Sequence, residues 1–278
     1  MHSLITLLSL LLFSTAVAQK STPINVASYN LRYDTPNDGP NAWPNRKEMV
    51  KRLIRYHGFD LFGTQEALRH QLTDITEMSE FAFVGKGRDD GREAGEHSAI
   101  VYRKDRFDLL DSGDFWLSQT PDRPSKGWDA TCCNRICSWA RFRDRRTRKT
   151  FYFFSAHFDH QGVEARRQSG KLMVEKIREI ARSEPVIFVG DLNSTPETEQ
   201  VQAIQTLLQD AYQVTAQPPY GPVGTFNGFK LNAPLADCID YIFVSKGTKV
   251  ERYAALSDIQ DQRFPSDHLP VVARVALP

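Results

Sequence analysis

The sequence predicts an α/β fold in which two β-sheets pack together and helices cover their outer faces, within one domain. Three observations support this prediction. Apolar, strand-like segments recur along the whole chain. Helical patterns separate some of them in the first third of the chain and near residue 180, which is typical of α/β proteins. Between residues 81 and 157 the strand-like segments follow one another directly, which indicates antiparallel hairpins.

The predicted strands are of two kinds. Some alternate apolar and polar residues, whereas others are wholly apolar, as expected for strands that are covered on both faces. In chain order they span residues 24–31, 60–65, 81–85, 98–103, 106–117, 136–142, 150–157, 185–191, 238–245 and 270–277.

Three segments carry helical patterns. Segment 45–57 has one apolar stripe, formed by Met49, Val50, Leu53 and Ile54. Segment 163–182 has another, formed by Leu172, Met173, Ile177, Ile180 and the stem of Lys176. Segment 197–210 follows Thr195 and Pro196, and proline in the first turn is a favourable helix start.

Composition and charge restrict the function classes. The chain is 41% hydrophobic and 25% charged, which is ordinary for a globular protein and sufficient for a large core. The net charge of +1 gives no overall signal for a nucleic-acid or membrane partner. One basic run, residues 141–149, is interpreted as a solvated hairpin tip; contact with a phosphate backbone is the alternative.

The N-terminus predicts export. Residues 4–18 are apolar and end in Ala16-Val17-Ala18, which fits the small-x-small pattern of a signal peptidase site. We expect cleavage after Ala18, a single mature domain over residues 19–278, and a periplasmic or extracellular location. The apolar stretch is shorter than the ~20 residues of a membrane span, so no stable membrane anchor is expected.

The cysteines are Cys132, Cys133, Cys137 and Cys238. Export permits disulfides. Because sequence neighbours rarely bridge each other, we expect Cys132 or Cys133 to pair with Cys137 or Cys238; free buried thiols are the alternative. A zinc site is disfavoured, because a second CxxC and a nearby HxxxH are both missing.

Polar side chains stand at or near one end of six predicted strands. They are Asn30, Glu66, His157, Asp191 with Asn193, Asp240, and Asp267 with His268. A single such residue is usually a turn residue or a helix cap. Strand ends on a common rim converge in space, so together these groups predict one cluster. Gathered carboxylates repel one another and require a cation or a shared proton, and Mg²⁺ or Mn²⁺ suits oxygen ligands.

The segments SYNLRYD, GTQEAL, SAHFDH, VGDLNSTP, CIDYIFVS and PSDHLPVVARV occur in this order from residue 28 to residue 274. The series resembles the endonuclease/exonuclease/phosphatase superfamily, which includes DNase I, apurinic endonucleases, inositol polyphosphate 5-phosphatases and neutral sphingomyelinases. It is most similar to a bacterial subgroup of small hydrolases. The resemblance implies a four-layer α/β sandwich and hydrolysis of phosphate esters by in-line attack of water with Mg²⁺ or Mn²⁺.

The resemblance also implies roles for individual residues. Glu66 is similar to the family's main metal ligand, with Asn30 assisting and Asp267 at or next to the metal. Asp191 matches the residue that activates or positions the attacking water, and Asn193 matches the residue that holds a phosphate oxygen.

Further roles concern the histidines. His268 matches the catalytic histidine, oriented by Asp240. His157 matches a second histidine that contacts phosphate, with Glu96 as its carboxylate partner. Arg32 stands where apurinic endonucleases carry an acid, which disfavours a second metal near Asn30 and suggests contact with the substrate phosphate.

The substrate is expected to be a small phosphate ester or a short oligonucleotide, and no protein partner is implied. Near-neutral charge disfavours a grip on long duplex DNA. Phe226, in the Pro- and Gly-rich loop 217–234, could stack on the substrate, and Arg135 and Trp128 could contact it from the rim. An irregular surface loop is the alternative for 217–234.

Three other functions were weighed. An exported nuclease acting on DNA or RNA keeps the chemistry and changes the substrate. A sphingomyelinase-type lipid phosphodiesterase needs an exposed apolar hairpin, for which only residues 114–121 are a candidate. A non-catalytic binding protein is disfavoured, because the metal and histidine sets are complete.

Overall fold

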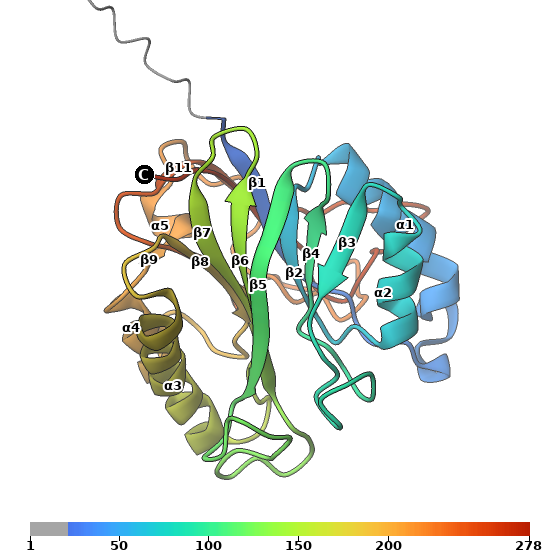
Figure 1. Cartoon of the computed structure of the whole chain (residues 1–278). Coiled ribbons are helices and arrows are strands. Elements are labelled where there is room, and N and C mark those ends of the chain that lie inside the picture. Colours follow the sequence, from blue (N-terminus) through green and yellow to red (C-terminus); the bar gives the residue numbers. More distant parts are fainter. Residues whose placement is uncertain (1–21) are drawn as a thin grey trace, which may run out of the picture.

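The computed structural model describes residues 22–278, which form two six-stranded sheets packed face to face with helices outside them (Figure 1). The first sheet has the strand order β11-β12-β1-β2-β4-β3. Its strands are β1 (Ile24–Asn30), β2 (Leu61–Gln65), β3 (Phe81–Val84), β4 (Ile100–Arg103), β11 (Lys249–Ala255) and β12 (Val271–Ala276). The second sheet has the order β5-β6-β7-β8-β10-β9. Its strands are β5 (Phe107–Trp116), β6 (Ile136–Asp144), β7 (Thr150–His157), β8 (Val186–Asp191), β9 (Gln209–Asp210) and β10 (Asp240–Val244).

Helices complete the outer layers. A 3₁₀ helix, η1 (Pro36–Asn41), precedes α1 (Trp43–Tyr56), and α2 (Arg69–Thr76) follows β2. Helices α1 and α2 share an apolar cluster with the outer face of the first sheet. Helices α3 (Val163–Ala181) and α4 (Glu199–Gln205) share another with the second sheet, and α5 (Ala211–Val214) follows β9. The four-layer α/β sandwich is thus confirmed.

The central core lies between the two sheets and is made of buried apolar side chains. It includes Val26 and Leu61 from the first sheet and Phe142, Phe153 and Ile187 from the second, all fully buried. Gly63 of β2 faces this interface, where an added Cβ would collide with Val189 and Ser155. Glycine at this position therefore lets the two sheets approach closely.

All ten predicted strands are present, with small differences at their ends. The prediction missed β11, the two-residue β9, the 3₁₀ helix η1 and the short helices α2 and α5. It also placed the start of the helix near 197–210 too early. Residues 195–198 form a turn closed by a hydrogen bond from the Thr198 backbone N–H to the Thr195 carbonyl, and α4 begins at Glu199.

The helical stripes are confirmed with one adjustment. In α1 the predicted apolar residues are buried. In α3, Met173 and Ile177 are buried, whereas Leu172 and Ile180 are only partly buried. Ser169 and Gly170 are buried as well, and α3 packs closely against α4 at Gly170, where a Cβ would meet the backbone of Gln200.

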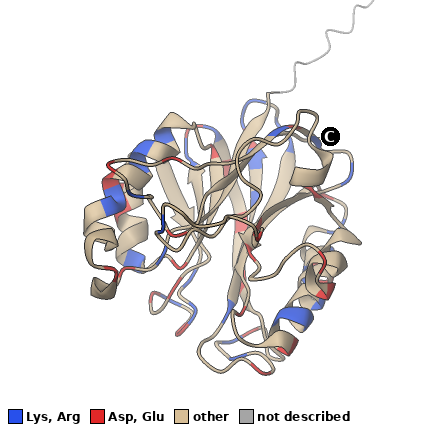
Figure 2. Ribbon diagram, turned by 180° about the vertical axis from the view of Figure 1, so that it is seen from behind, with Lys and Arg blue, Asp and Glu red and all other residues tan. Residues whose placement is uncertain are grey.

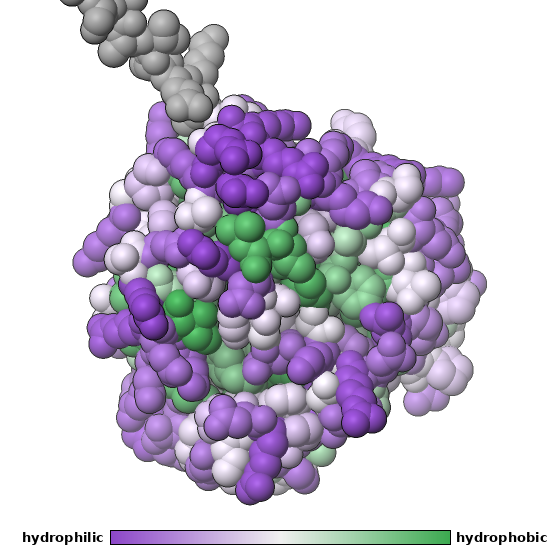
Figure 3. Space-filling view, in the orientation of Figure 1, coloured by the Kyte–Doolittle hydropathy of each residue, from purple (hydrophilic) through white to green (hydrophobic). Residues whose placement is uncertain are grey.

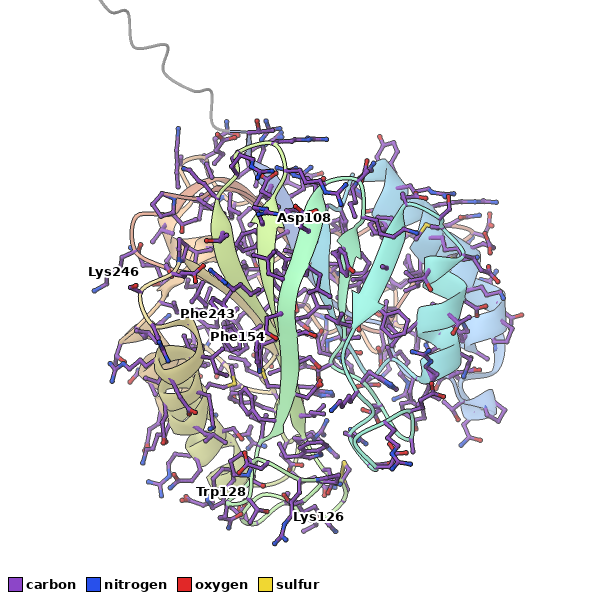
Figure 4. The ribbon with its side chains drawn as sticks, in the orientation of Figure 1. Asp108, Lys126, Trp128, Phe154, Phe243 and Lys246 are labelled. Atoms are coloured by element: carbon purple, nitrogen blue, oxygen red, sulfur yellow. A yellow bond between two sulfur atoms is a disulfide. The ribbon has the colours of Figure 1, made fainter. Side chains whose placement is uncertain are left out.

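The basic run at residues 141–149 is a hairpin tip, as predicted, between β6 and β7. Arg143 and Arg145 form ion pairs with Asp108, and Arg141 pairs with Glu184. Figure 4 shows Asp108, near the start of β5, far from Trp128, which lies in the segment that follows the other end of this strand. These three arginines are paired with carboxylates of the same protein, which reduces what the run offers to a phosphate backbone.

The expected disulfide pairing is wrong. Cys132 and Cys133 form a disulfide with each other. Cys137 is a free, buried thiol, and Cys238 is a free, half-buried thiol. Cys137 lies within β6 and packs into the apolar cluster under α3, whereas Cys132 and Cys133 lie in the open segment before this strand. The two parts of the chain therefore face different environments.

The surface is mixed in charge and mostly polar. Figure 2 shows basic and acidic residues interspersed over helices and loops on both sides of the molecule. Figure 3 shows a largely hydrophilic face with apolar residues in its middle, and Leu109 and Leu110 of the edge strand β5 are 36% and 39% exposed. Among residues 22–278, no helix has the length and apolarity needed to span a membrane. The expected cleavage site after Ala18 lies outside the described residues.

Candidate active site

Three neighbouring strands of the second sheet bring three ionisable groups to one level. In the strand register, His157 at the end of β7 pairs with Asp191 at the end of β8, and Asp191 pairs with Asp240 at the start of β10. Because β10 runs antiparallel to β8, its first residue lies beside the last residue of β8. The three side chains are almost completely buried.

The first sheet supplies Asn30 and Glu66 at its corresponding edge. Asn30 ends β1 beside Gln65 of β2, and Glu66 follows with φ of 61°, a left-handed backbone that is rare for glutamate. Strained backbone of this kind is concentrated at functional sites. The Asn30 amide nitrogen donates to Glu66 (3.2 Å) and to Asp191 (2.9 Å), and thereby joins the two sheets.

His268 and Asp240 form a buried pair. Asp240 Oδ2 accepts hydrogen bonds from His268 Nδ1 (2.9 Å) and from the Thr225 hydroxyl (2.6 Å), whereas Oδ1 has no protein partner. Burial alone would lower the pKa of His268, but the carboxylates of Asp240 and Asp191 outweigh it and raise this pKa well above the ordinary value. The other ring nitrogen, Nε2, lies 3.7 Å from Asp191 Oδ2.

Asp191 lies at the centre of the cluster. Burial, followed by the charge of Asp240, raises the pKa of Asp191 to about 7. Burial also raises the pKa of Asp267, which is 7% exposed. Several carboxylates thus share a small, poorly solvated space, which is the electrostatic situation that a cation relieves.

His157 is held as a neutral imidazole. The Asn193 amide donates to His157 Nε2 (3.1 Å), which therefore accepts and leaves the proton on Nδ1. Burial, then the charges of Arg135 and Arg88, lower the pKa of His157 well below its usual value. Asn193 has a φ of 45°, a conformation that asparagine tolerates.

The donor set of Glu66 and Asp267 fits a hard divalent cation. Both carboxylates face the guanidinium of Arg32, at 3.8 Å for Glu66 and 3.9 Å for Asp267, distances too long for hydrogen bonds. The shared guanidinium neighbour places the two carboxylates near each other, and each of these oxygens keeps at least one lone pair for a further partner. Carboxylate oxygens of this kind suit Mg²⁺ or Mn²⁺. Asn30 Oδ1 accepts from the Arg32 backbone N–H (2.9 Å).

Arg46 of α1 fixes the loops that carry these ligands. It is 2% exposed and donates to the carbonyl oxygens of Leu31, Arg32 and Pro265. It thus ties the segment after β1 to the segment before Asp267. The sequence alone did not reveal this role, because lysines and arginines also fill the exposed face of the same helix.

A cavity of about 600 Å³ unites most of the predicted residues. Its lining includes predicted site residues from both sheets, namely Arg32, Glu66, Glu96, Arg135, His157, Asp191, Asn193, Phe226, Asp267 and His268. Asn30 and Asp240 do not line the cavity and act behind it through their hydrogen bonds. Trp128 does not line it either.

Sequence reasoning missed part of the lining. The residues it did not single out are Tyr33, Arg88, His160, Cys132, Cys133 and Ile239. Three of these six, Arg88, Cys132 and Cys133, come from two long loops, 85–99 and 117–135, which extend from the same end of the two sheets (Figure 1). The other three lie just outside the ends of β1, β7 and β10. The Gly-rich composition of 85–95 was the one available signal for a ligand-facing loop.

The contacts of Glu96 and Phe226 differ in detail from those that were predicted. Glu96 lies 4.0 Å from His157 Nδ1, but its closest partner is Arg88, at 2.6 Å. Phe226 is 49% exposed and packs edge-on to the His268 ring, with centroids 5.0 Å apart. Of the aromatic residues in loop 217–234, Tyr220 faces a separate apolar cavity of about 340 Å³.

The apolar residues of segment 114–121 are not available for membrane contact. Phe115, Trp116 and Leu117 are at most 4% exposed. The Trp116 indole donates to the Arg88 carbonyl (2.7 Å), so it fastens the two loops instead. The described residues thus remove the candidate hairpin of a lipid phosphodiesterase.

Comparison with known proteins agrees with this geometry. The model of the endonuclease/exonuclease/phosphatase family matches residues 27–268. A mannosyl-6-phosphatase from Bacteroides thetaiotaomicron is 41% identical with a TM-score of 0.87, covering 91% of this chain and all of that one. A second family protein from the same organism is 42% identical with a TM-score of 0.89, covering 93% and 99% of the two chains.

More distant matches are found by structure and by sequence. The human nocturnin catalytic domain is 20% identical, with a TM-score of 0.70 over 92% of this chain and 94% of that one. Two uncharacterized proteins of Acanthamoeba polyphaga mimivirus are each 25% identical over 75% and 83% of this chain. The match spans 36% of the first of these proteins and 91% of the second.

Proposed function

Because the chain belongs to the endonuclease/exonuclease/phosphatase family, we propose that it hydrolyses a small phosphate ester, with a sugar phosphate as the substrate class, and that it uses Mg²⁺ or Mn²⁺. The observation that carries this proposal is the convergence of Glu66, Asp191 and His268 on one cavity of about 600 Å³. Asp191 and His268 face each other and have shifted pKa values, and a pair of this kind in a cavity is a candidate for catalysis.

The attacking water sits between Asp191 Oδ2 and His268 Nε2, which lie 3.7 Å apart; the Asp191 carboxylate accepts its proton, while the raised pKa of His268 keeps that ring protonated. Asp240 orients the His268 ring through Nδ1 and compensates its charge. The neutral His157, whose proton is on Nδ1, donates to a phosphoryl oxygen, and the Asn193 amide holds this ring in place by donating to Nε2 and to the Phe158 carbonyl.

Glu66 and Asp267, assisted by Asn30, would hold the cation, which when bound neutralises a phosphoryl oxygen and stabilises charge on the leaving oxygen. Glu66 is supported in this role by its left-handed backbone and by a hydrogen bond from the Tyr33 N–H (3.2 Å), which aim its carboxylate into the cavity.

Two observations favour a small substrate. The cavity is bordered by loops 85–99 and 117–135, which leave room for a sugar phosphate rather than for a long duplex. The net charge of +1 and the paired arginines of the β6–β7 hairpin offer little for a phosphate backbone. The mannosyl-6-phosphatase relative supports a hexose 6-phosphate as the first compound to test.

The test is a substrate panel. Purified protein is incubated with mannose 6-phosphate, glucose 6-phosphate, a short oligonucleotide and plasmid DNA, each with Mg²⁺, with Mn²⁺ and with EDTA. We expect phosphate release from a sugar phosphate that EDTA abolishes. A rate that EDTA leaves unchanged would refute the metal assignment. Salt-sensitive cleavage of plasmid with no phosphate release from the sugars would instead support the nuclease alternative.

The proposed location is outside the cytoplasm, on the basis of the apolar segment 4–18 and Ala16-Val17-Ala18. N-terminal sequencing of protein recovered from the producing cells tests it. The expected first residue is Gln19, and recovery of an intact Met1 from the cytoplasm would contradict it.

A further inference from the structure

The arginines Arg88 and Arg135 reach the candidate active site from opposite loops and have unsatisfied hydrogen-bond donors. Arg88 lies in loop 85–99 of the first sheet, and Arg135 lies at the end of loop 117–135, before β6 of the second sheet. Both line the main cavity, and both also line a smaller adjoining recess together with His157 and Glu66. Their side chains are only 12% and 5% exposed.

Arg135 is held so that one nitrogen is left without a protein partner. Its Nη2 donates to His160 Nδ1 (2.7 Å), and its Nε contacts the buried carboxylate of Asp159 (3.4 Å). Its Nη1 is buried and has no hydrogen-bond partner among the described residues. A buried guanidinium normally satisfies its N–H groups, so an unsatisfied nitrogen in a residue that lines a cavity points to a ligand.

Arg88 has the same character. Its Nη1 donates to Glu96 (2.6 Å), whereas its buried Nε has no hydrogen-bond partner, with Asp89 3.9 Å away. The main chain of Arg88 is fixed, because its carbonyl accepts hydrogen bonds from Trp116 at the end of β5 (2.7 Å) and from Asn134 of the other loop (3.1 Å). The guanidinium is therefore preorganised.

The two guanidinium groups act on each other. Burial lowers the pKa of Arg88, and the charge of Arg135 lowers it further against the opposing effect of Glu96. Two like charges held together in a poorly solvated space are costly unless an anion joins them. Arg32, which also lines the cavity, differs from these two arginines, because its Nε and Nη2 already donate to the Asp38 carboxylate at 2.9 and 3.0 Å.

We propose that Arg88 and Arg135 bind the second charged, non-bridging oxygen of the reacting phosphate and thereby make the enzyme selective for phosphate monoesters over diesters. This inference rests on the proposed function. A monoester phosphate carries a charge of about −1.5 to −2 near neutral pH, whereas a diester carries about −1. In a diester this oxygen bears a carbon, so it presents neither the charge nor the space that a guanidinium fork requires.

The test uses two substrates that share one leaving group, p-nitrophenyl phosphate and methyl p-nitrophenyl phosphate. We expect Arg88→Gln and Arg135→Lys each to lower kcat/KM for the monoester by about 10²-fold, the cost of one preorganised donor. For the methyl diester we expect less than about a 3-fold change, because the donor has no charged oxygen to bind. The ratio of the two kcat/KM values is measured on one sample, so a loss of folded protein cancels.

Arg123→Gln is the matched control, because Arg123 is an exposed residue of the same loop that does not line the cavity. Its monoester-to-diester ratio should equal that of the wild type. An equal fall for both substrates in the two variants would overturn the inference and leave the proposed function intact. A wild-type protein that hydrolyses neither compound with Mg²⁺ or Mn²⁺ would instead refute the proposed function, and the inference with it.

Discussion

Asp240→Asn removes one negative charge from the buried contact with His268 at almost constant side-chain size. Asp240 is fully buried, and its Oδ2 accepts from both His268 and Thr225. To keep both hydrogen bonds, the asparagine must turn its oxygen toward them and place its NH₂ group where Oδ1 has no partner. The variant can therefore orient the ring but cannot compensate its charge.

The size of the effect follows from the geometry. At an effective dielectric constant of about 20 and a charge separation of about 4 Å, the lost attraction is about 4 kcal/mol. If most of this attraction acts in the transition state, kcat falls by about 10²- to 10³-fold. Asp240 does not line the cavity, so KM should change by less than about 3-fold.

The assay is steady-state hydrolysis of p-nitrophenyl phosphate with saturating Mg²⁺. Asp210→Asn is the matched control, because Asp210 is also a buried carboxylate and pairs with Phe243 of the same strand β10, away from the cavity. It should retain turnover. If Asp240→Asn keeps full kcat, or loses activity only through KM, the orienting role of Asp240 is wrong.

Three further outcomes are expected. Burial raises the pKa of Asp210 from 3.8 to about 6, so ionisation of this side chain destabilises the fold as the pH rises from about 4 to above 6. Asp210→Asn should therefore increase the unfolding free energy by up to about 3 kcal/mol at pH 8, seen as a higher melting temperature, but not at pH 4. An equal effect at both pH values would contradict this. Arg46→Met leaves buried carbonyl groups of Leu31 and Pro265 without donors and should destabilise the fold by about 3 kcal/mol or more, measured by urea unfolding; an unchanged midpoint would refute the positioning role. Gly63→Ala should cost about 1–3 kcal/mol in the same experiment because its Cβ collides with the facing sheet, and a neutral result would show that the sheets can separate without cost.

The strand ends, and the cluster of polar side chains that they form, were predictable from local sequence patterns. Strands carry a strong local signal, and a polar residue at the end of an apolar run is conspicuous. His157, Asp191 and Asp240 then become neighbours through strand pairing alone, since β7, β8 and β10 are adjacent. Strand β11 was missed because segment 249–255 mixes charged and apolar residues on an edge that is partly exposed.

The loops were not predictable in the same way. Arg88 reaches the cavity because Trp116 and Asn134, which are distant in sequence, hold its carbonyl. The bridge between Cys132 and Cys133 likewise depends on Cys137 being drawn into the core beneath α3. Contacts between segments far apart in the chain decide both features, and no local pattern encodes them.

The central claim is that one divalent cation and the substrate phosphate occupy the same cavity beside Glu66. Paramagnetic broadening of the ³¹P signal of inorganic phosphate by bound Mn²⁺ measures this directly, because the effect requires the ion and the phosphorus to be close together. We predict strong broadening with the wild-type protein and its loss in Glu66→Gln, with the fold unchanged by circular dichroism. Broadening that persists in Glu66→Gln, or Mn²⁺ bound without any effect on phosphate, would contradict the account.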